Sequence, residues 1–151
     1  MARVQIDLPD KFIYSTKLQV RIGDVAAGFH MGNHMLISYL NEALLLFFRE
    51  AGVIGMFGTK MNLIDADLAV IYKTEAAHGD MLRVDLGIIP SGIYGFDAFY
   101  RVTNERTGEE IAIAKMAMLF FDYEQRQISP VPEAFTVALP KIYNRAIPST
   151  E

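Results

Sequence analysis

The densest group of chemically active side chains in this sequence lies between Arg21 and His34. The stretch holds an aspartate, two histidines, an asparagine and three glycines, namely Asp24, His30, His34, Asn33, Gly23, Gly28 and Gly32. It leads from a segment typical of a strand into one typical of a helix. Backbone N–H groups at the start of a helix have no partner within the helix, so they can hold an anion or an oxyanion that forms during a reaction. Titratable side chains beside such donors favour acyl-transfer chemistry.

The elements that flank this stretch follow from the spacing of the apolar residues. Alternating apolar and polar residues predict a strand over 14–23. From Met35 onward almost every residue is apolar, which predicts a helix that is buried on most of its sides. The few polar residues of this helix fall on one narrow stripe, formed by Ser38, Asn41, Glu42 and Arg49. Gly52 stands where the helix is expected to end.

The rest of the chain has the pattern of β-strands. Apolar and polar residues alternate in four further segments, at 68–77, 81–89, 93–103 and 111–121. Short connections make these four strands mainly antiparallel. A short helix is expected at 130–135. Because a curved sheet of about five strands can bury one apolar helix, we expect an α+β fold rather than a doubly wound one.

Length and composition restrict the class of protein. The 151 residues suit a single domain, 1–151, and the absence of cysteine excludes disulfides, metal thiolates and a cysteine nucleophile. A formal net charge of −4 without a Lys/Arg cluster argues against a nucleic acid partner. The longest apolar run, 43–48, is too short to span a membrane, and the N-terminus lacks the apolar core of a signal peptide, so we expect a cytoplasmic protein. The high apolar content predicts that a second copy covers part of the surface.

The order of the motifs resembles that of hotdog-fold thioesterases of the 4-hydroxybenzoyl-CoA thioesterase superfamily. Members often have Arg-x-x-Asp, then Gly-x-His-x-x-Asn, then a helix with Leu-x-Glu-Ala. The corresponding residues here are Arg21, Asp24, Gly28, His30, Asn33, Leu40, Glu42 and Ala43. The Gly79-Asp80 turn and the segments 99–104, 120–122 and 132–133 match later motifs. The resemblance covers roughly residues 14–137 and implies one curved sheet wrapped around a central helix.

The resemblance also implies an activity. It points to an acyl-CoA thioesterase, or to an enzyme for acyl-carrier thioesters, in which CoA is part of the substrate and no cofactor or metal is needed. It implies a homodimer or a homotetramer arranged as a dimer of dimers. It places the oxyanion hole at the backbone N–H of about Asn33, at the start of the central helix. The side chain of Asn33 has a second, compatible interpretation as the helix N-cap.

Three side chains, Asp24, His34 and Glu42, are candidates for the group that activates water. Asp24 either deprotonates water, or attacks the acyl carbon, or simply pairs with Arg21 in a turn. His34 stands where some relatives carry a carboxylate, so it is a candidate base near neutral pH. Glu42 lies on the central helix, from which other hotdog enzymes take their carboxylate, or it faces a neighbouring strand. His30 and His34 have i,i+4 spacing, but no glutamate follows His30, so we expect them to border the substrate rather than hold zinc.

One departure from the family pattern bears on the mechanism. Many relatives carry a second carboxylate two residues after the first, and this chain has Ala26 there. A protein that binds acyl thioesters without hydrolysing them is therefore an alternative hypothesis. A third hypothesis, an enoyl-CoA hydratase-like enzyme, would use Asp24 and His30, but the Asn-Pro that usually lies between such residues is missing.

Overall fold

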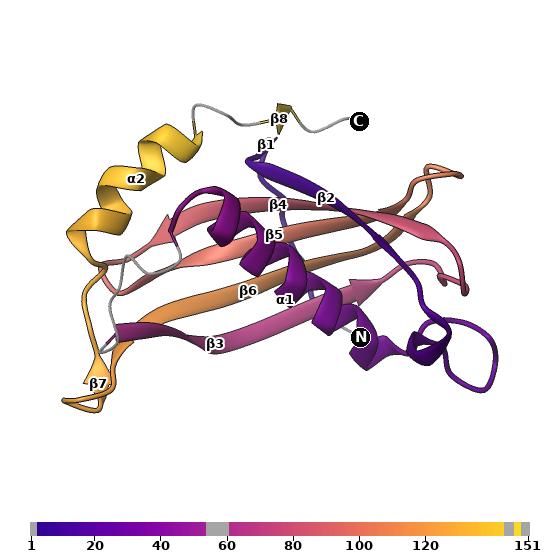
Figure 1. Ribbon diagram of the computed structural model, residues 1–151, viewed down its shortest axis with the longest axis horizontal. Helices are drawn as coiled ribbons and strands as arrows, with labels where there is room; N and C mark the ends of the chain where they lie inside the picture. Colours follow the sequence, from indigo (N-terminus) through magenta and orange to yellow (C-terminus); the bar gives the residue numbers. More distant parts are fainter. Residues whose placement is uncertain (1–2, 54–60, 144–146, 149–151) are drawn as a thin grey trace.

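The computed structural model describes residues 3–53, 61–143 and 147–148. The elements in chain order are β1 (Lys11–Phe12), β2 (Tyr14–Gln19), a 3-10 turn η1 (Ile22–Asp24), α1 (Asn33–Glu50), β3 (Met61–Tyr72), β4 (Met81–Ser91), β5 (Gly95–Asn104), β6 (Glu110–Asp122), β7 (Gln127–Ile128), α2 (Glu133–Tyr143) and β8 (Ile147–Pro148). Figure 1 shows α1 lying across the concave face of one sheet, with its first residues near the end of β3.

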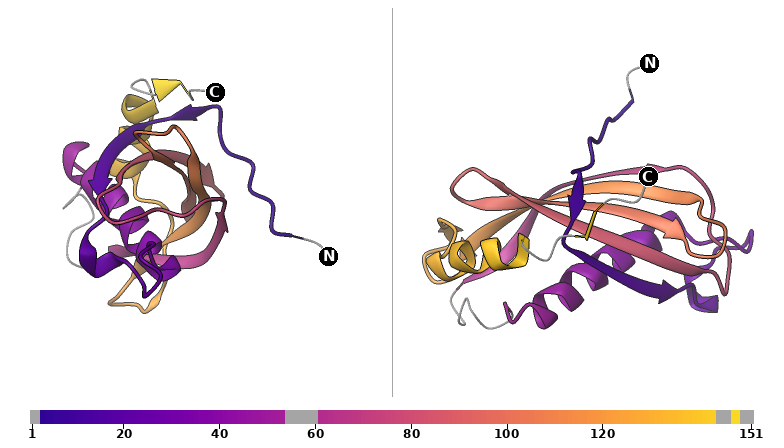
Figure 2. Two further views of the ribbon diagram at one scale, coloured as in Figure 1. Left: turned by 90° about the vertical axis from the view of Figure 1, so that its right-hand side faces the viewer. Right: turned by 90° about the horizontal axis from the view of Figure 1, so that it is seen from above.

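The sheet is antiparallel and strongly curved. Its strands follow the order β2-β4-β5-β6-β3, and the short β7 pairs with β6. β1 and β8 form a separate two-stranded pairing. Seen from its end, the sheet curls and α1 lies on its concave side (Figure 2). The predicted α+β fold, with one sheet around one long helix, is confirmed. Within the described residues, no helix combines the length and the apolar character needed to cross a membrane.

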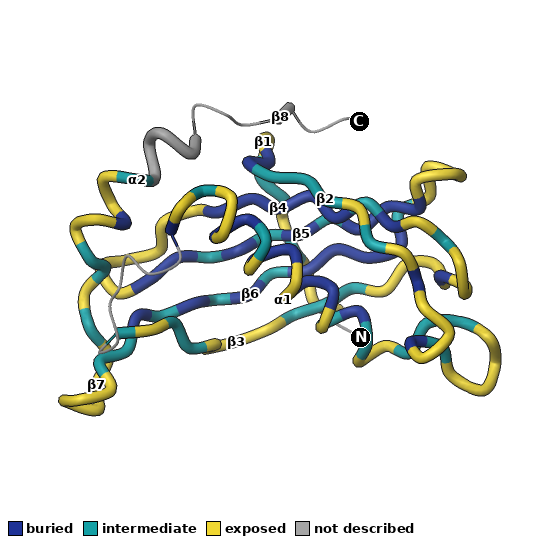
Figure 3. The backbone as a smooth tube through the Cα atoms, viewed as in Figure 1, coloured by how far each residue is buried: buried dark blue, intermediate teal, exposed yellow. Residues whose placement is uncertain are grey.

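The core lies between α1 and the concave face of the sheet. The buried side of α1 consists of Leu36, Tyr39, Leu40, Ala43, Leu44, Phe47 and Phe48. They belong to one cluster with inward-facing residues of β4, β5 and β6 (Figure 3). Fully burying one such leucine stabilises the fold by about 1.5–3 kcal/mol. The predicted polar stripe of α1 is exposed, and Leu45 is exposed beside it. Gly52, with φ 72°, follows the helix end as expected.

Two predicted strand ends are wrong, and both lie close to the site. The strand expected over 14–23 ends at Gln19, because the Asp24 carboxylate accepts a hydrogen bond from the Arg21 N–H and the chain turns into η1. The strand expected over 68–77 ends at Tyr72. The N–H groups of the next two residues both donate to the carbonyl of Ile111, which bends the chain away from the strand direction.

The first half of β3 was also missed, because a bulge breaks its alternation. The strand begins at Met61, and its register with β6 shifts between Asp65 and Asp67. A bulge places an extra residue in one strand, so the apolar residues before and after it no longer share one period. The helix expected at 130–135 begins at Glu133, directly after Pro132, and is α2.

Candidate active site

The start of α1 leaves one backbone donor without a partner among the described residues. Gly32 is the N-cap residue, so the predicted N-cap role of Asn33 is wrong. The Gly32 N–H donates to the Asp24 carbonyl at 3.0 Å, and the Met35 N–H donates to the Gly32 carbonyl at 3.0 Å. The His34 N–H donates to Oδ1 of Asn33 at 2.8 Å. The backbone N–H of Asn33 remains, and it is the donor that the resemblance assigns to the oxyanion hole.

This helix start borders a cavity of about 490 Å³. The polar part of its lining comes from His30, Asn33, His34, Tyr72, Thr74 and Glu75. These residues belong to two segments that are distant in sequence: the loop before α1 and the chain after β3. Hydrogen bonds join the segments, since the Met31 N–H donates to the Ala76 carbonyl at 2.7 Å and the Tyr72 hydroxyl donates to the Asn33 carbonyl at 2.7 Å.

His30 has a defined orientation in this cavity. Its Nδ1 lies 3.2 Å from the carbonyl oxygen of Gly28. A carbonyl oxygen only accepts, so we infer that Nδ1 carries the proton and that Nε2 of the neutral ring is the free acceptor. The Glu75 carboxylate lies 3.7 Å from the same Nδ1. A Cβ at Gly28 would lie 2.7 Å from Cε1 of His30, so only glycine leaves room for the imidazole in this position.

Asp24 is buried, and its carboxylate is hydrogen-bonded to Arg21 and Tyr39 rather than facing the cavity. Its side chain is 2% exposed and does not line the cavity. Its carboxylate accepts hydrogen bonds from the backbone N–H, Nε and Nη2 of Arg21, at 3.0, 3.2 and 3.2 Å, and from the Tyr39 hydroxyl. Burial raises the pKa of this carboxyl, but the hydrogen bonds from Arg21 and Tyr39 outweigh it, so the pKa lies below its ordinary value. The pairing with Arg21 is therefore what the structure shows.

The remaining candidates are placed differently. His34 lies in the first turn of α1 with an exposed side chain and lines the cavity. His30 precedes the helix, so the i,i+4 spacing of the two histidines is not a helical spacing. Glu42 is exposed on the outer stripe of α1 and does not line the cavity. In the part of the chain that the structure describes, no three His, Asp or Glu side chains gather in a way that would hold a metal ion.

Glu75 is a cavity residue that the sequence analysis missed. The polar run Lys73-Thr74-Glu75 follows an apolar strand, and this was the available signal, but the strand predicted over 68–77 concealed it. In the structure, Lys73 pairs with the Glu110 carboxylate and the Thr74 hydroxyl donates to the Glu110 carbonyl. These two contacts anchor the run, and the Glu75 side chain faces His30.

A curved antiparallel sheet around one long helix is the hotdog fold. Residues 20–139 match the Thioesterase-like superfamily, and the chain belongs to this superfamily, a class of thioester hydrolases. Among curated proteins, it is similar to a chloroplastic palmitoyl-acyl carrier protein thioesterase from Gossypium hirsutum, with 26% identity over 132 residues. That match covers 82% of this chain and 32% of the cotton protein, so the chain spans about a third of that relative's length.

Solved structures show the same fold at low identity. A 1,4-dihydroxy-2-naphthoyl-CoA thioesterase from Synechocystis has a TM-score of 0.76 and 17% identity, covering 86% of this chain and 96% of that one. A 12:0-ACP thioesterase from Umbellularia californica has a TM-score of 0.77 and 16% identity, covering 85% of this chain and 53% of that one. These similarities confirm the hotdog fold.

Proposed function

We propose that this protein hydrolyses an acyl thioester in the cavity at the start of α1, with CoA or an acyl carrier protein as the leaving group and no separate cofactor. The observation that supports this proposal is that one cavity holds both the unpartnered N–H of Asn33 and the imidazole of His30. The first is a donor for a carbonyl oxygen, and the second offers Nε2 as an acceptor for a proton of water.

The reaction follows from these two groups. The carbonyl oxygen of the thioester accepts a hydrogen bond from the Asn33 N–H, and the positive end of α1 stabilises the charge that develops on this oxygen. His30 takes a proton from the attacking water through Nε2, and Glu75 stabilises the imidazolium. When the C–S bond breaks, the thiolate leaves and receives that proton. Thiols ionise near pH ~8.5, so this leaving group needs little help from an acid.

This arrangement accounts for the missing carboxylate at Ala26. In this proposal His30, four residues after Ala26, is the base. Its carboxylate partner is Glu75, which follows β3. His34 is the second candidate base in the same cavity. Asp24, whose oxygens are already bonded, serves in this proposal to hold the loop in place, because its carbonyl also accepts the Gly32 N–H.

We also propose that the protein is a homodimer or a dimer of dimers. Large apolar side chains of α1 and β3 are exposed in the single chain, with Leu45 at 51%, Leu68 at 39% and Tyr72 at 48%. β3 is an edge strand that pairs only with β6 among the described strands. Exposed apolar edges of this kind are usually covered. A monomeric mass in sedimentation equilibrium at micromolar concentration would contradict the proposal.

The test of the activity follows thiol release from a panel of acyl-CoA and acyl-carrier thioesters. We expect turnover by the wild type and a loss of about 10²–10⁴-fold in His30→Gln. The matched control is His78→Gln, because His78 is exposed and lies outside the cavity lining. Tight binding without thiol release would instead support the non-catalytic binding protein. Addition of water to an enoyl thioester without hydrolysis would support the hydratase-like alternative.

A further inference from the structure

The Tyr100 hydroxyl on β5 lacks a function in the fold of the single chain. It is the one buried side-chain polar atom without a hydrogen-bond partner among the described residues, and Tyr100 as a whole is inaccessible to solvent. A buried hydroxyl in this state has lost its hydrogen bonds to water without replacement. Tyr39, in contrast, places its hydroxyl against the Asp24 carboxylate. A phenylalanine would fill the same space as Tyr100 without this cost, so the oxygen atom requires another explanation.

Tyr100 lies on the concave face of the sheet, one row along and two strands across from Tyr72, and it does not line the cavity itself. The strand register pairs it with Leu86 on β4 and Ala114 on β6, and pairs Ala114 with Val70 on β3. The next row along β3 ends at Tyr72, whose hydroxyl contacts the first residue of α1. Rows on one face of a sheet are about 7 Å apart. Neighbouring strands are about 4.8 Å apart and Tyr100 lies two strands in from β3, so an acyl group that starts at the helix must pass over β6 as well as along one row to reach it.

On the side of this face next to β3, α1 covers the sheet less closely. α1 packs closely against β4 and β2 rather than against β3. Leu68, whose β6 partner Met116 belongs to the core, is 39% exposed on this side. Asp65 on the same strand is exposed and is paired with the core residue Met118. Burial and the negative charge of Asp65 both raise the pKa of the Tyr100 hydroxyl, so this group keeps its proton and acts as a donor.

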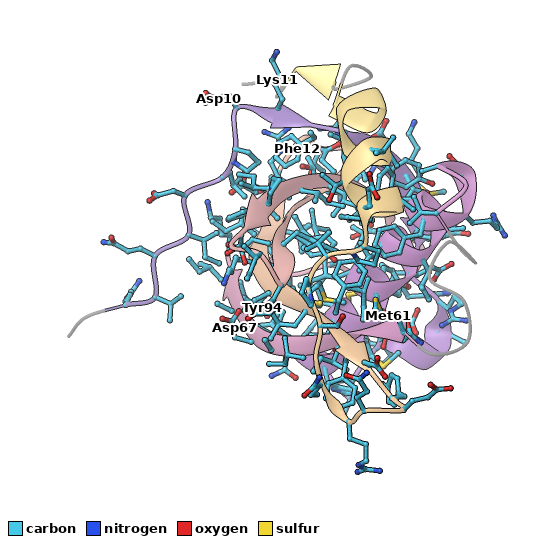
Figure 4. The ribbon with its side chains drawn as sticks, turned by 90° about the vertical axis from the view of Figure 1, so that its left-hand side faces the viewer. Asp10, Lys11, Phe12, Met61, Asp67 and Tyr94 are labelled. Atoms are coloured by element: carbon cyan, nitrogen blue, oxygen red, sulfur yellow. The ribbon has the colours of Figure 1, made fainter. Side chains whose placement is uncertain are left out.

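We propose that Tyr100 determines which acyl group the protein accepts: its hydroxyl donates a hydrogen bond to an uncharged oxygen, a hydroxyl or keto group, carried several carbons beyond the thioester carbonyl. This proposal rests on the proposed thioester hydrolysis. A hydroxyl suits the position especially well, because its own hydrogen is attracted by the Asp65 carboxylate. The same carboxylate repels a second anion, so acyl groups that end in a carboxylate are disfavoured. Asp65 lies on β3 between Met61 and Asp67, two residues that are labelled in Figure 4.

The test compares CoA thioesters of equal length whose acyl groups are unsubstituted, hydroxylated at successive positions, or carboxylated at the end. We expect the wild type to prefer a hydroxylated substrate in kcat/KM, and we expect Tyr100→Phe to reduce this preference about tenfold, the effect of one hydrogen bond. The matched control is Tyr14→Phe, which removes a hydroxyl that bonds to Glu50, and it should keep the wild-type preference. Asp65→Asn should raise kcat/KM for the carboxylated substrate.

The outcomes separate this proposal from the activity on which it rests. If the wild type and Tyr100→Phe hydrolyse all substrates with the same preference, the role of Tyr100 is overturned while the hydrolase remains. If the wild type hydrolyses none of them, both fail. A second measurement needs no substrate: Tyr100→Phe should unfold at the same temperature as the wild type or higher, whereas Tyr39→Phe should unfold lower. A lower unfolding temperature for Tyr100→Phe would show that the hydroxyl already has a partner, such as an ordered water, and would overturn the proposal.

Discussion

Replacing Asp24 with asparagine distinguishes a structural carboxylate from a catalytic one. The side chain keeps its shape but loses its charge, and its new NH₂ group faces the donors of Arg21 and Tyr39. The Arg21 side chain is 74% exposed, so solvent screens its ion pair with Asp24 and the pair is left out of the sum. The backbone N–H of Arg21 and the Tyr39 hydroxyl each contribute about 1 kcal/mol. We therefore expect Asp24→Asn to lower the free energy of unfolding by about 2 kcal/mol.

The assay is urea unfolding of both proteins across a pH series. The pKa of Asp24 is lowered in the folded protein, so its carboxylate stabilises the fold at pH values above its unfolded pKa and loses this effect as the pH falls through the lowered folded pKa. The difference between wild type and Asp24→Asn should be constant above about pH 5 and shrink below about pH 4. Tyr39→Phe should cost about 1 kcal/mol, and the double variant should be less destabilised than the sum of the two.

Activity decides between the two roles of Asp24. With a structural role, Asp24→Asn assayed well below its unfolding temperature should keep at least a tenth of the wild-type kcat. Removal of a general base would instead cost about 10²–10⁴-fold. An Asp24→Asn variant that is as stable as the wild type at pH 7 but has lost activity to that extent would refute the reasoning.

Three further substitutions test the neighbourhood of the site. Gly28→Ala should lower kcat about tenfold by displacing the His30 ring, with little change in unfolding temperature because residue 28 is exposed; steady-state kinetics and thermal unfolding check this. Tyr72→Phe removes the hydrogen bond to the Asn33 carbonyl, so we expect it to cost about 0.5–1 kcal/mol in urea unfolding. Gly95→Ala would place a Cβ 1.9 Å from a backbone oxygen of β6, and urea unfolding should show a loss of at least about 2 kcal/mol.

The central helix and the order of the strands could be predicted because they depend on local patterns. The apolar run after Met35 has a narrow polar stripe, and the exposed side of α1 follows that stripe. The start of β3 could not be predicted in this way, because the bulge between Asp65 and Asp67 interrupts the alternation that marks a strand. The strand end at Gln19 depends on the bonds of one aspartate with one arginine, which the turn pattern allowed but did not require.

The location of the site could be predicted from the sequence, but the contacts between its side chains could not. The stretch between Arg21 and His34 does line the cavity through His30, Asn33 and His34, as its composition suggested. Glu75, however, reaches His30 only because the loop before α1 bonds to the chain after β3, and the spacing within either segment contains no sign of this pairing. The bonds of Asp24 likewise involve Tyr39, a residue of the helix interior that the sequence analysis treated as apolar.

The loop before α1 makes the Asn33 N–H available by satisfying the donors on both sides of it. The Gly32 N–H donates to the Asp24 carbonyl, and the His34 N–H donates to the side-chain oxygen of Asn33. At the start of a helix, several backbone N–H groups ordinarily lack a partner within the helix, and water competes for each of them. Here the neighbouring donors are occupied, so in the proposed mechanism a carbonyl oxygen that enters the cavity would meet the single N–H of Asn33. Preorganisation of this kind is what makes a backbone donor effective in stabilising an oxyanion, because no reorientation is needed as the charge develops. The buried carboxylate of Asp24 supports this geometry by holding the loop, which is a reason for its presence that does not require it to touch the substrate.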